Sequence, residues 1–286
     1  MNGLSDRIGG LIGGAVTHCS PMSGGDLSSV VRFGCADGRE GVAKSGPDVA
    51  AEAAMLRAMA ATGVRVPQVL AQSGHLMLLS LVPGSSGPTG AWDDLAGQLA
   101  LLHAPAPGQA YGWESDYAFG KVAIANSRSG DWPRFWAENR LLCHVPHLRT
   151  SLARRIEALA ARIGEHLPAS PPPSLLHGDL WGGNVMAEHG RITGLIDPAC
   201  YYGDREVDAA MLTLFDSPPD RFFDALDLAP GWRGRQPVYR LWPLLVHVRL
   251  FGGGYEASAE QALDALGCRG EKDASASRNS ALDSRA

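Results

Sequence analysis

This sequence lacks the features of a membrane-bound, nucleic-acid-binding or disulfide-rich protein. Its net charge of −5 and pI near 6.0 provide no basic surface for nucleic acid or an anionic membrane. No apolar run is long enough to span a membrane, and the first residues lack the cationic and apolar regions of a signal peptide. The five cysteines include no Cys-x-x-Cys pair. We therefore expect a cytoplasmic protein with reduced thiols.

Two common nucleotide-binding signatures are also missing. The sequence contains no G-x-x-x-x-G-K-[ST] loop, and no G-x-G-x-x-G opens a predicted helix, so neither a Walker loop nor a Rossmann site is expected. The chain does have 286 residues, of which 45% are hydrophobic and 19% charged. This composition suffices for a sizeable core in one large domain or two lobes.

The most informative motif is H-G-D-L-W-G-G-N at residues 177–184, which is followed by Asp197. Asp179 can accept the proton of an attacking hydroxyl, and Asn184 and Asp197 offer the oxygen ligands that Mg²⁺ prefers. The spacing from Asp179 to Asn184 is typical of the base and the metal-binding Asn in a protein-kinase catalytic loop. A hairpin predicted over residues 185–196 would bring Asn184 and Asp197 together. The motif therefore indicates Mg²⁺-dependent phosphoryl transfer.

The sequence upstream contains candidates for the ATP-binding parts of such a site. Lys44 ends a predicted strand at residues 40–44, where a kinase places the Lys that contacts the α- and β-phosphates. A helix is predicted from Pro47 to about Gly63, with Glu52 on its apolar face. Because a carboxylate on an inward face needs a cationic partner, we expect Glu52 to pair with Lys44.

Two further segments are candidates for nucleotide contacts. A Gly-rich turn precedes the strand predicted at Val30, and its backbone amides and hydroxyls can approach a phosphate. The phosphate-loop candidates are Gly24, Gly25 and Ser28. The apolar run 76–82 is predicted to be a buried strand that ends at the lobe junction, where backbone groups can contact adenine. The adenine-contact candidates are Ser80, Leu81 and Val82.

The distribution of strands and helices predicts an α+β, bilobal, protein-kinase-like fold. Residues 1–82 form the nucleotide-binding lobe, a small antiparallel sheet with one helix, and residues 83–267 form a larger, mainly helical catalytic and substrate lobe. Residues 268–286 are rich in Ser, Ala and charge, so we expect a disordered tail. Helices of the larger lobe are predicted at 92–103, 132–143, 151–166, 205–215, 237–251 and 257–266.

Two segments resemble the fructosamine kinase (ketosamine kinase) family, whose members have the aminoglycoside-phosphotransferase and protein-kinase-like fold. They are residues 177–184 and the run I-D-P-A-C-Y-Y-G-D-R-E-V-D at 196–208. The resemblance implies ATP-dependent phosphorylation of the hydroxyl on the third carbon of a ketosamine such as fructosamine or ribulosamine. The phosphorylated product is unstable and frees the amine, which amounts to deglycation. Trp181 and Tyr202 would then contact the sugar, and the charged residues at 204–208 would fix the loop.

The resemblance leaves alternatives open. The family's phosphate loop reads S-G-G-C, whereas this chain has Asp26 in the position of the Cys. An aminoglycoside, choline or other small-alcohol phosphotransferase would use the same H-G-D, Asn and Asp residues. A nucleotide-binding pseudo-enzyme is a further alternative, although binding alone does not require all of Lys44, Glu52, Asp179, Asn184 and Asp197. The substrate could be a small ketosamine, a glycated amine or a glycated protein lysine.

Overall fold

The computed structural model describes residues 2–22 and 29–268 and divides into two compact units. The first unit contains Met1–Gln109 and Pro172–Leu228, and the second contains Ala110–Pro171 and the chain from Ala229 onward. The expected tail, apart from Cys268, lies outside the described residues. None of the helices in the described part of the chain has both the length and the apolar character needed to cross a membrane.

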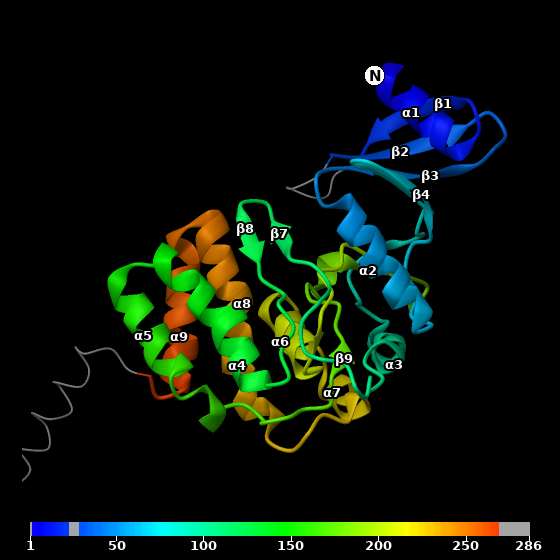
Figure 1. Ribbon diagram of the computed structural model, residues 1–286. Coiled ribbons are helices and arrows are strands. Elements are labelled where there is room, and N and C mark those ends of the chain that lie inside the picture. The colour runs from blue at the N-terminus through cyan, green and yellow to red at the C-terminus, as the bar shows by residue number, and fades with distance from the viewer. Residues whose placement is uncertain (1, 23–28, 269–286) are drawn as a thin grey trace, which may run out of the picture. The chain divides into compact units, whose positions relative to one another are not determined.

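A five-stranded antiparallel sheet forms the N-terminal part of the first unit (Figure 1). Its strand order is β1-β2-β3-β5-β4. The central strand, β3, therefore pairs directly with β5. This confirms the small antiparallel sheet predicted from the sequence. The strands are β1 (Val16–Pro21), β2 (Ser29–Cys35), β3 (Glu40–Ser45), β4 (Val69–Ser73) and β5 (Leu76–Leu79).

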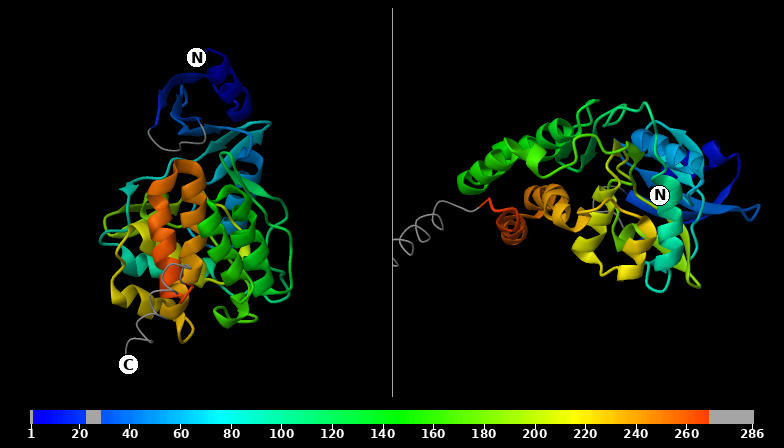
Figure 2. Two further views of the ribbon diagram at one scale, coloured as in Figure 1. Left: turned by 90° about the vertical axis from the view of Figure 1, so that its left-hand side faces the viewer. Right: turned by 90° about the horizontal axis from the view of Figure 1, so that it is seen from below.

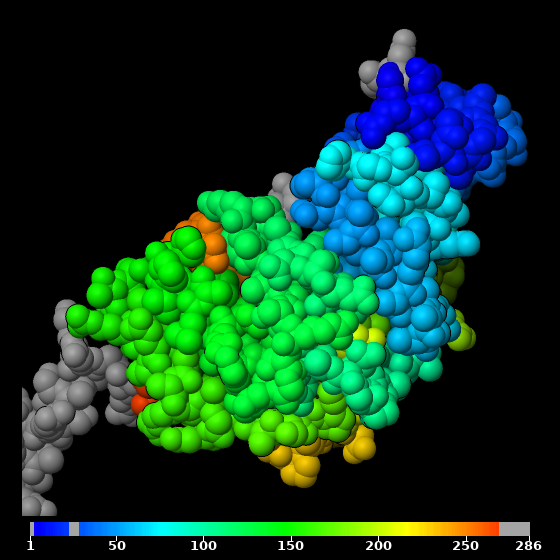
Figure 3. Space-filling view, viewed as in Figure 1, coloured from blue at the N-terminus to red at the C-terminus, as the bar shows by residue number. Residues whose placement is uncertain are grey.

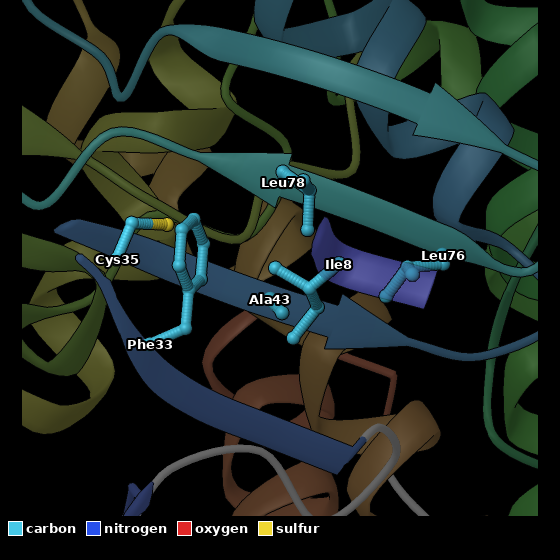
Figure 4. Close-up of a cluster of buried hydrophobic side chains, with 6 residues drawn as sticks. All are labelled: Ile8, Phe33, Cys35, Ala43, Leu76 and Leu78. Carbon is cyan, nitrogen blue, oxygen red and sulfur yellow. The ribbon is translucent and has the colours of Figure 1, made fainter. Parts of the chain in front are cut away.

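Two helices cover opposite faces of this sheet, α1 (Asn2–Ile12) and α2 (Val49–Ala61). Successive side chains of a strand point to opposite faces, so β5 contributes Leu76 and Leu78 to the α1 side and Met77 and Leu79 to the α2 side. Its whole length is therefore apolar and buried. Figure 4 shows the α1 side, where Leu76 and Leu78 lie near Ile8, Phe33, Cys35 and Ala43. Both helices also form part of the molecular surface on the face seen in Figure 3.

Helix α1 was not predicted, because only one helix was expected in this part of the chain. Its sequence contains three glycines, each of which disfavours a helix by about 1 kcal/mol relative to alanine. Leu4, Ile8, Leu11 and Ile12 nevertheless recur at helical spacing and pack on the sheet. Tertiary packing of this apolar stripe thus outweighs the weak helix propensity.

The remainder of the first unit contains the hairpin that was predicted at residues 185–196. Strands β10 (Val185–Glu188) and β11 (Arg191–Leu195) are antiparallel, with Val185 opposite Leu195, and β6 (Ser85–Ser86) pairs with β10. Two short strands, β9 (Ser174–Leu175) and β12 (Tyr202–Gly203), form a separate pair. Helix α7 was not predicted. The helices are α3 (Trp92–Leu102), α6 (Glu206–Phe215) and α7 (Asp220–Leu226).

The second unit is mainly helical, and three of its helices differ from the prediction. The helix predicted at 151–166 ends at Ala160 and is followed by a 3₁₀ turn at Ile163–Glu165. The helix predicted at 132–143 is a short α-helix followed by a π-helical and a 3₁₀ segment, and the helix predicted to begin at Pro237 begins at Trp232. Helices α8 and α9 lie side by side in both views of Figure 2. The elements are β7 (Tyr117–Phe119), β8 (Val122–Ile124), α4 (Trp132–Trp136), α5 (Thr150–Ala160), α8 (Trp232–Phe251) and α9 (Glu256–Ala265).

Candidate active site

Asp179 and Asn184 are held together at the start of the β10–β11 hairpin. The side-chain amide of Asn184 donates both to the backbone oxygen of Asp179, at 2.8 Å, and to its carboxylate, at 3.1 Å. This leaves the carbonyl oxygen of the Asn184 side chain as the atom that can ligate a cation. Burial raises the pKa of the Asp179 carboxyl to about 7, an effect that the hydrogen bond from Asn184 only partly offsets.

The hairpin brings Asp197 next to this pair. The backbone N–H of Ile196 donates to the backbone oxygen of Asn184 at 3.0 Å, so the residue that precedes Asp197 is bonded directly to Asn184. Asp197 itself has a left-handed backbone conformation, with φ of 53°. Non-glycine residues adopt this region infrequently, and such strain tends to occur at functional sites. The side chain of Asp197 stays 40% exposed and is therefore accessible to a ligand.

Lys44 connects the five-stranded sheet to the hairpin. Its ammonium lies 2.7 Å from the Glu52 carboxylate and 2.8 Å from Asp197 Oδ1. Burial alone would lower the pKa of Lys44, but the two carboxylates outweigh it and raise the pKa above its usual value. The expected Lys44–Glu52 ion pair is thus present. Lys44 stays positively charged and also pairs with the Asp197 carboxylate.

His177 links the loop that carries Asp179 to the strand that leads to Asp197. Its Nε2 donates to the backbone oxygen of Ile196 at 2.9 Å, and its Nδ1 accepts the N–H of Asp179 at 3.3 Å. A neutral ring protonated on Nε2 satisfies both bonds. Burial lowers the pKa of His177, which keeps the ring in that neutral form. The buried ring therefore hydrogen-bonds to both chain segments and fixes their separation.

Asp208, in the first half of α6, fixes the backbone immediately before Asp179. Its fully buried carboxylate accepts the N–H of His177 at 2.8 Å and the N–H of Gly178 at 2.9 Å, and also lies 2.8 Å from Nε2 of His103. Burial would raise the pKa of Asp208, but the hydrogen bond from His103 and the other donors lower it overall. Asp208 was expected to fix a loop, whereas nothing in the sequence pointed to His103 as its partner.

Two glycines in this loop allow close packing. Gly178 has φ of +78°, and a Cβ at this position would lie 2.0 Å from the backbone oxygen of Ala199, so no other residue fits without movement. Gly182 donates its N–H to the Asp216 carboxylate at 2.7 Å. This contact between the loop and the end of α6 was not predicted, because the sequence offers no signal that joins positions so far apart.

The other predicted site residues lie as follows. Ser80 bonds to Gln68 through both its N–H and its hydroxyl, while Val82 lies beside Gly194 in β11, next to the segment that leads to Asp197. Leu81 lies between Ser80 and Val82 in the chain. Tyr202 is half-buried in β12, opposite Leu175. The phosphate-loop candidates Gly24, Gly25 and Ser28 lie outside the described residues.

These residues limit the kind of metal that the site can hold. Within residues 2–22 and 29–268, no three His, Cys, Asp or Glu residues are grouped closely enough to enclose a metal ion by themselves. The amide oxygen of Asn184 and the carboxylate of Asp197 are hard oxygen donors on adjoining segments. Such a partial ligand set suits Mg²⁺, which usually takes one or two protein ligands together with phosphate oxygens and water.

Comparisons with known proteins identify the family of this chain. The sequence profile described as fructosamine kinase matches residues 17–268. A protein from Thermus thermophilus named as a probable ketoamine kinase is 36% identical over 263 residues, which cover 86% of this chain and 92% of the relative. A crystal structure from Thermobifida fusca, named provisionally as a fructosamine-3-kinase, superposes with a TM-score of 0.84 at 31% identity and covers 93% of this chain and 98% of its own.

A more distant structure extends the comparison to the fold alone. An aminoglycoside phosphotransferase, solved with ADP and hygromycin B, has a TM-score of 0.64 at 19% identity and covers 93% of this chain and 96% of its own. This likeness confirms the predicted aminoglycoside-phosphotransferase and protein-kinase-like fold. The profile match spans most of the chain, and the similar proteins are matched over nearly their whole length. The chain therefore belongs to the fructosamine kinase family and is an ATP-dependent phosphotransferase.

Proposed function

We propose that this chain transfers the γ-phosphoryl group of ATP to the hydroxyl on the third carbon of a ketosamine such as fructosamine or ribulosamine. The product then loses phosphate by elimination and releases the amine, which reverses the glycation of small amines or of protein lysines. The convergence of Lys44, Asp179, Asn184 and Asp197 carries the proposal. Phosphoryl transfer needs such an arrangement of a base, cation ligands and a phosphate-binding charge.

In this proposal each residue acts by position and charge. Asp179 accepts the proton of the sugar hydroxyl while the hydroxyl oxygen bonds to the γ-phosphorus. The bond from that phosphorus to the β–γ bridging oxygen breaks, and ADP leaves. Asn184 orients the Asp179 carboxylate through its amide, and Lys44, held by Glu52, donates to the α- and β-phosphates.

The donor set described above fits Mg²⁺, with Asn184 and Asp197 as its protein ligands. Bound there, Mg²⁺ would offset the negative charge of the phosphates. We further propose that the segment Ser80–Leu81–Val82 contacts adenine, with Leu81 and Val82 offering the backbone groups, since Ser80 is bonded to Gln68. Gly24, Gly25 and Ser28 are proposed to contact phosphate, and Trp181 and Tyr202 are proposed to contact the sugar.

A substrate panel tests this function. ADP release is measured with Mg-ATP and fructosyl and ribulosyl derivatives of a small amine, of lysine and of a protein, with aminoglycosides and choline alongside. We expect turnover on a ketosamine, followed by the appearance of inorganic phosphate and free amine in ³¹P and ¹H NMR spectra. Turnover of an aminoglycoside or of choline without any ketosamine turnover would overturn the proposal.

A further inference from the structure

Two exposed aromatic side chains contact each other, and one of them belongs to the loop that carries Asp179. Trp181 is 40% exposed and Phe215 is 44% exposed, and their rings meet edge to face with centroids 5.9 Å apart. Trp181 follows Asp179 by two positions, while Phe215 is the last residue of α6. Two separate segments therefore build one solvent-accessible aromatic surface, and such surfaces are common where a ligand packs.

A carboxylate is fixed next to this aromatic pair. Asp216 directly follows Phe215, and its Oδ2 accepts the N–H of Gly182, which directly follows Trp181, at 2.7 Å. A Cβ at Gly182 would lie 2.3 Å from Asp216 Oδ1, so both carboxylate oxygens lie against that glycine. No basic side chain in the described part of the chain forms an ion pair with Asp216. Its negative charge is therefore not neutralised by a neighbouring Lys or Arg.

The Trp181 ring also lies over the turn that separates the base from the cation ligand. A Cβ at Gly183 would lie 2.2 Å from the Trp181 ring, so the ring covers the α-carbon of that glycine. The backbone oxygen of Trp181 accepts the N–H of Asn184 at 2.9 Å. Trp181 thus belongs to the same short loop as Asp179 and Asn184, and Phe215 and Asp216 contact that loop from the end of α6.

We propose that Trp181, Phe215 and Asp216 form a subsite for the protonated amine of the substrate, an inference that rests on the proposed function. A secondary alkylamine carries a positive charge near neutral pH, and aromatic rings together with a carboxylate attract such a cation. In a ketosamine the nitrogen is attached to the carbon on one side of the carbonyl, and the reacting hydroxyl is on the other side. The amine therefore lies within a few ångströms of the hydroxyl, which matches the position of Trp181 two residues after Asp179 and the contact of Asp216 with Gly182 in the same loop.

The subsite distinguishes ketosamines from neutral sugars of the same shape. Asp216 contributes the charge, while Trp181 and Phe215 contribute apolar contact and cation–π attraction. The contribution should appear mainly in KM, because the amine takes no part in the bond that forms and its charge does not change during transfer.

The test compares two substrates that differ only in this charge. One is a fructosyl alkylamine, and the other is the ether in which oxygen replaces the nitrogen. Asp216→Asn keeps an oxygen that can accept the Gly182 N–H but removes the charge, and Asp224→Asn, at an exposed position of α7, is the matched control. We expect Asp216→Asn to raise KM for the amine about tenfold while leaving KM for the ether and the behaviour of the control unchanged.

Other outcomes separate the possible failures. An equal loss on both substrates would show that Asp216 only holds the loop, and no loss on either would show that it does not contact the substrate; each result overturns the subsite. Should thermal unfolding show that Asp216→Asn does not fold, Phe215→Leu replaces it, because that change leaves the Asp216–Gly182 contact intact. Absence of ketosamine turnover by the unsubstituted protein would overturn the proposed function and, with it, the subsite.

Discussion

Replacing Asp208 with asparagine should loosen the loop that carries Asp179. The Asp208 carboxylate is inaccessible to solvent and accepts hydrogen bonds from two backbone N–H groups and from the His103 ring. Asparagine retains one acceptor oxygen and presents an NH₂ group where the second oxygen was. At least one buried N–H, of His177 or of Gly178, then faces another donor and loses its partner.

The size of the effect follows from these contacts. A hydrogen bond to a charged group contributes about 1.5–3 kcal/mol, and a buried donor without a partner costs about 1–3 kcal/mol. We therefore expect Asp208→Asn to lower the free energy of unfolding by about 3 kcal/mol, which corresponds to a fall in Tm of about 5 °C for a chain of this size. Because Asp179 follows Gly178 directly, kcat should also fall by about a hundredfold.

The sign of the pH dependence follows from the lowered pKa of Asp208 in the folded protein. A carboxyl whose folded pKa lies below its unfolded value, about 3.9, stabilises the protein above that pH. The stabilisation is lost as the pH falls through the folded pKa. The difference in unfolding free energy between the unsubstituted protein and Asp208→Asn should therefore be full above about pH 5 and shrink below about pH 4.

Urea denaturation across pH 3–8, together with steady-state ADP release, measures both effects. Asp224→Asn makes the same chemical change at an exposed position and should alter the unfolding free energy by less than about 0.5 kcal/mol. If Asp208→Asn were as stable and as active as this control, Asp208 would not be what positions the loop.

Three further substitutions test other parts of the site. Gly178→Ala should lower the unfolding free energy by about 3 kcal/mol in denaturant titrations, since its Cβ would meet the Ala199 backbone at 2.0 Å and φ is +78°; an unchanged midpoint would contradict this. For Gly183→Ala the three atoms nearest to the new Cβ all belong to the Trp181 ring, which can turn away. We therefore expect little change in stability and a KM for the ketosamine raised about fivefold. A large stability loss at constant KM would contradict the expectation that the ring can turn away. Glu52→Gln removes one of the two carboxylates that hold Lys44 and should raise KM for ATP about tenfold without affecting KM for the ketosamine. A raised KM for the ketosamine with an unchanged KM for ATP would contradict the assignment of Lys44 to the nucleotide site.

Local sequence signals were sufficient for the elements that carry most of the candidate site. Two short apolar runs separated by a Glu-His-Gly turn predicted the β10–β11 hairpin, and the apolar face of α2 indicated that Glu52 points inward toward Lys44. These signals depend on residues only a few positions apart. The roles of Lys44, Asp179, Asn184 and Asp197 in binding and transfer stay predictions.

The features that sequence reasoning missed depend on long-range packing. Helix α1 contains three glycines and forms because its apolar stripe packs on the sheet. The bonds from Asp208 to the loop and from Asp216 to Gly182 join positions about 30 residues apart, and no local pattern specifies such partners. A buried acid such as Asp208 within the apolar run of α6 indicates only that some donor must satisfy it, without identifying which.

The most direct test of the account is the turnover of Asp179→Asn on a ketosamine. Asparagine has nearly the same shape as aspartate and cannot accept the hydroxyl proton as a carboxylate does. We predict that this variant binds Mg-ATP with the same affinity in calorimetry as the unsubstituted protein, while its kcat for ADP release falls by at least about a thousandfold. Retention of kcat within a fewfold of the unsubstituted protein would contradict the assignment of Asp179 as the base on which the proposed reaction depends.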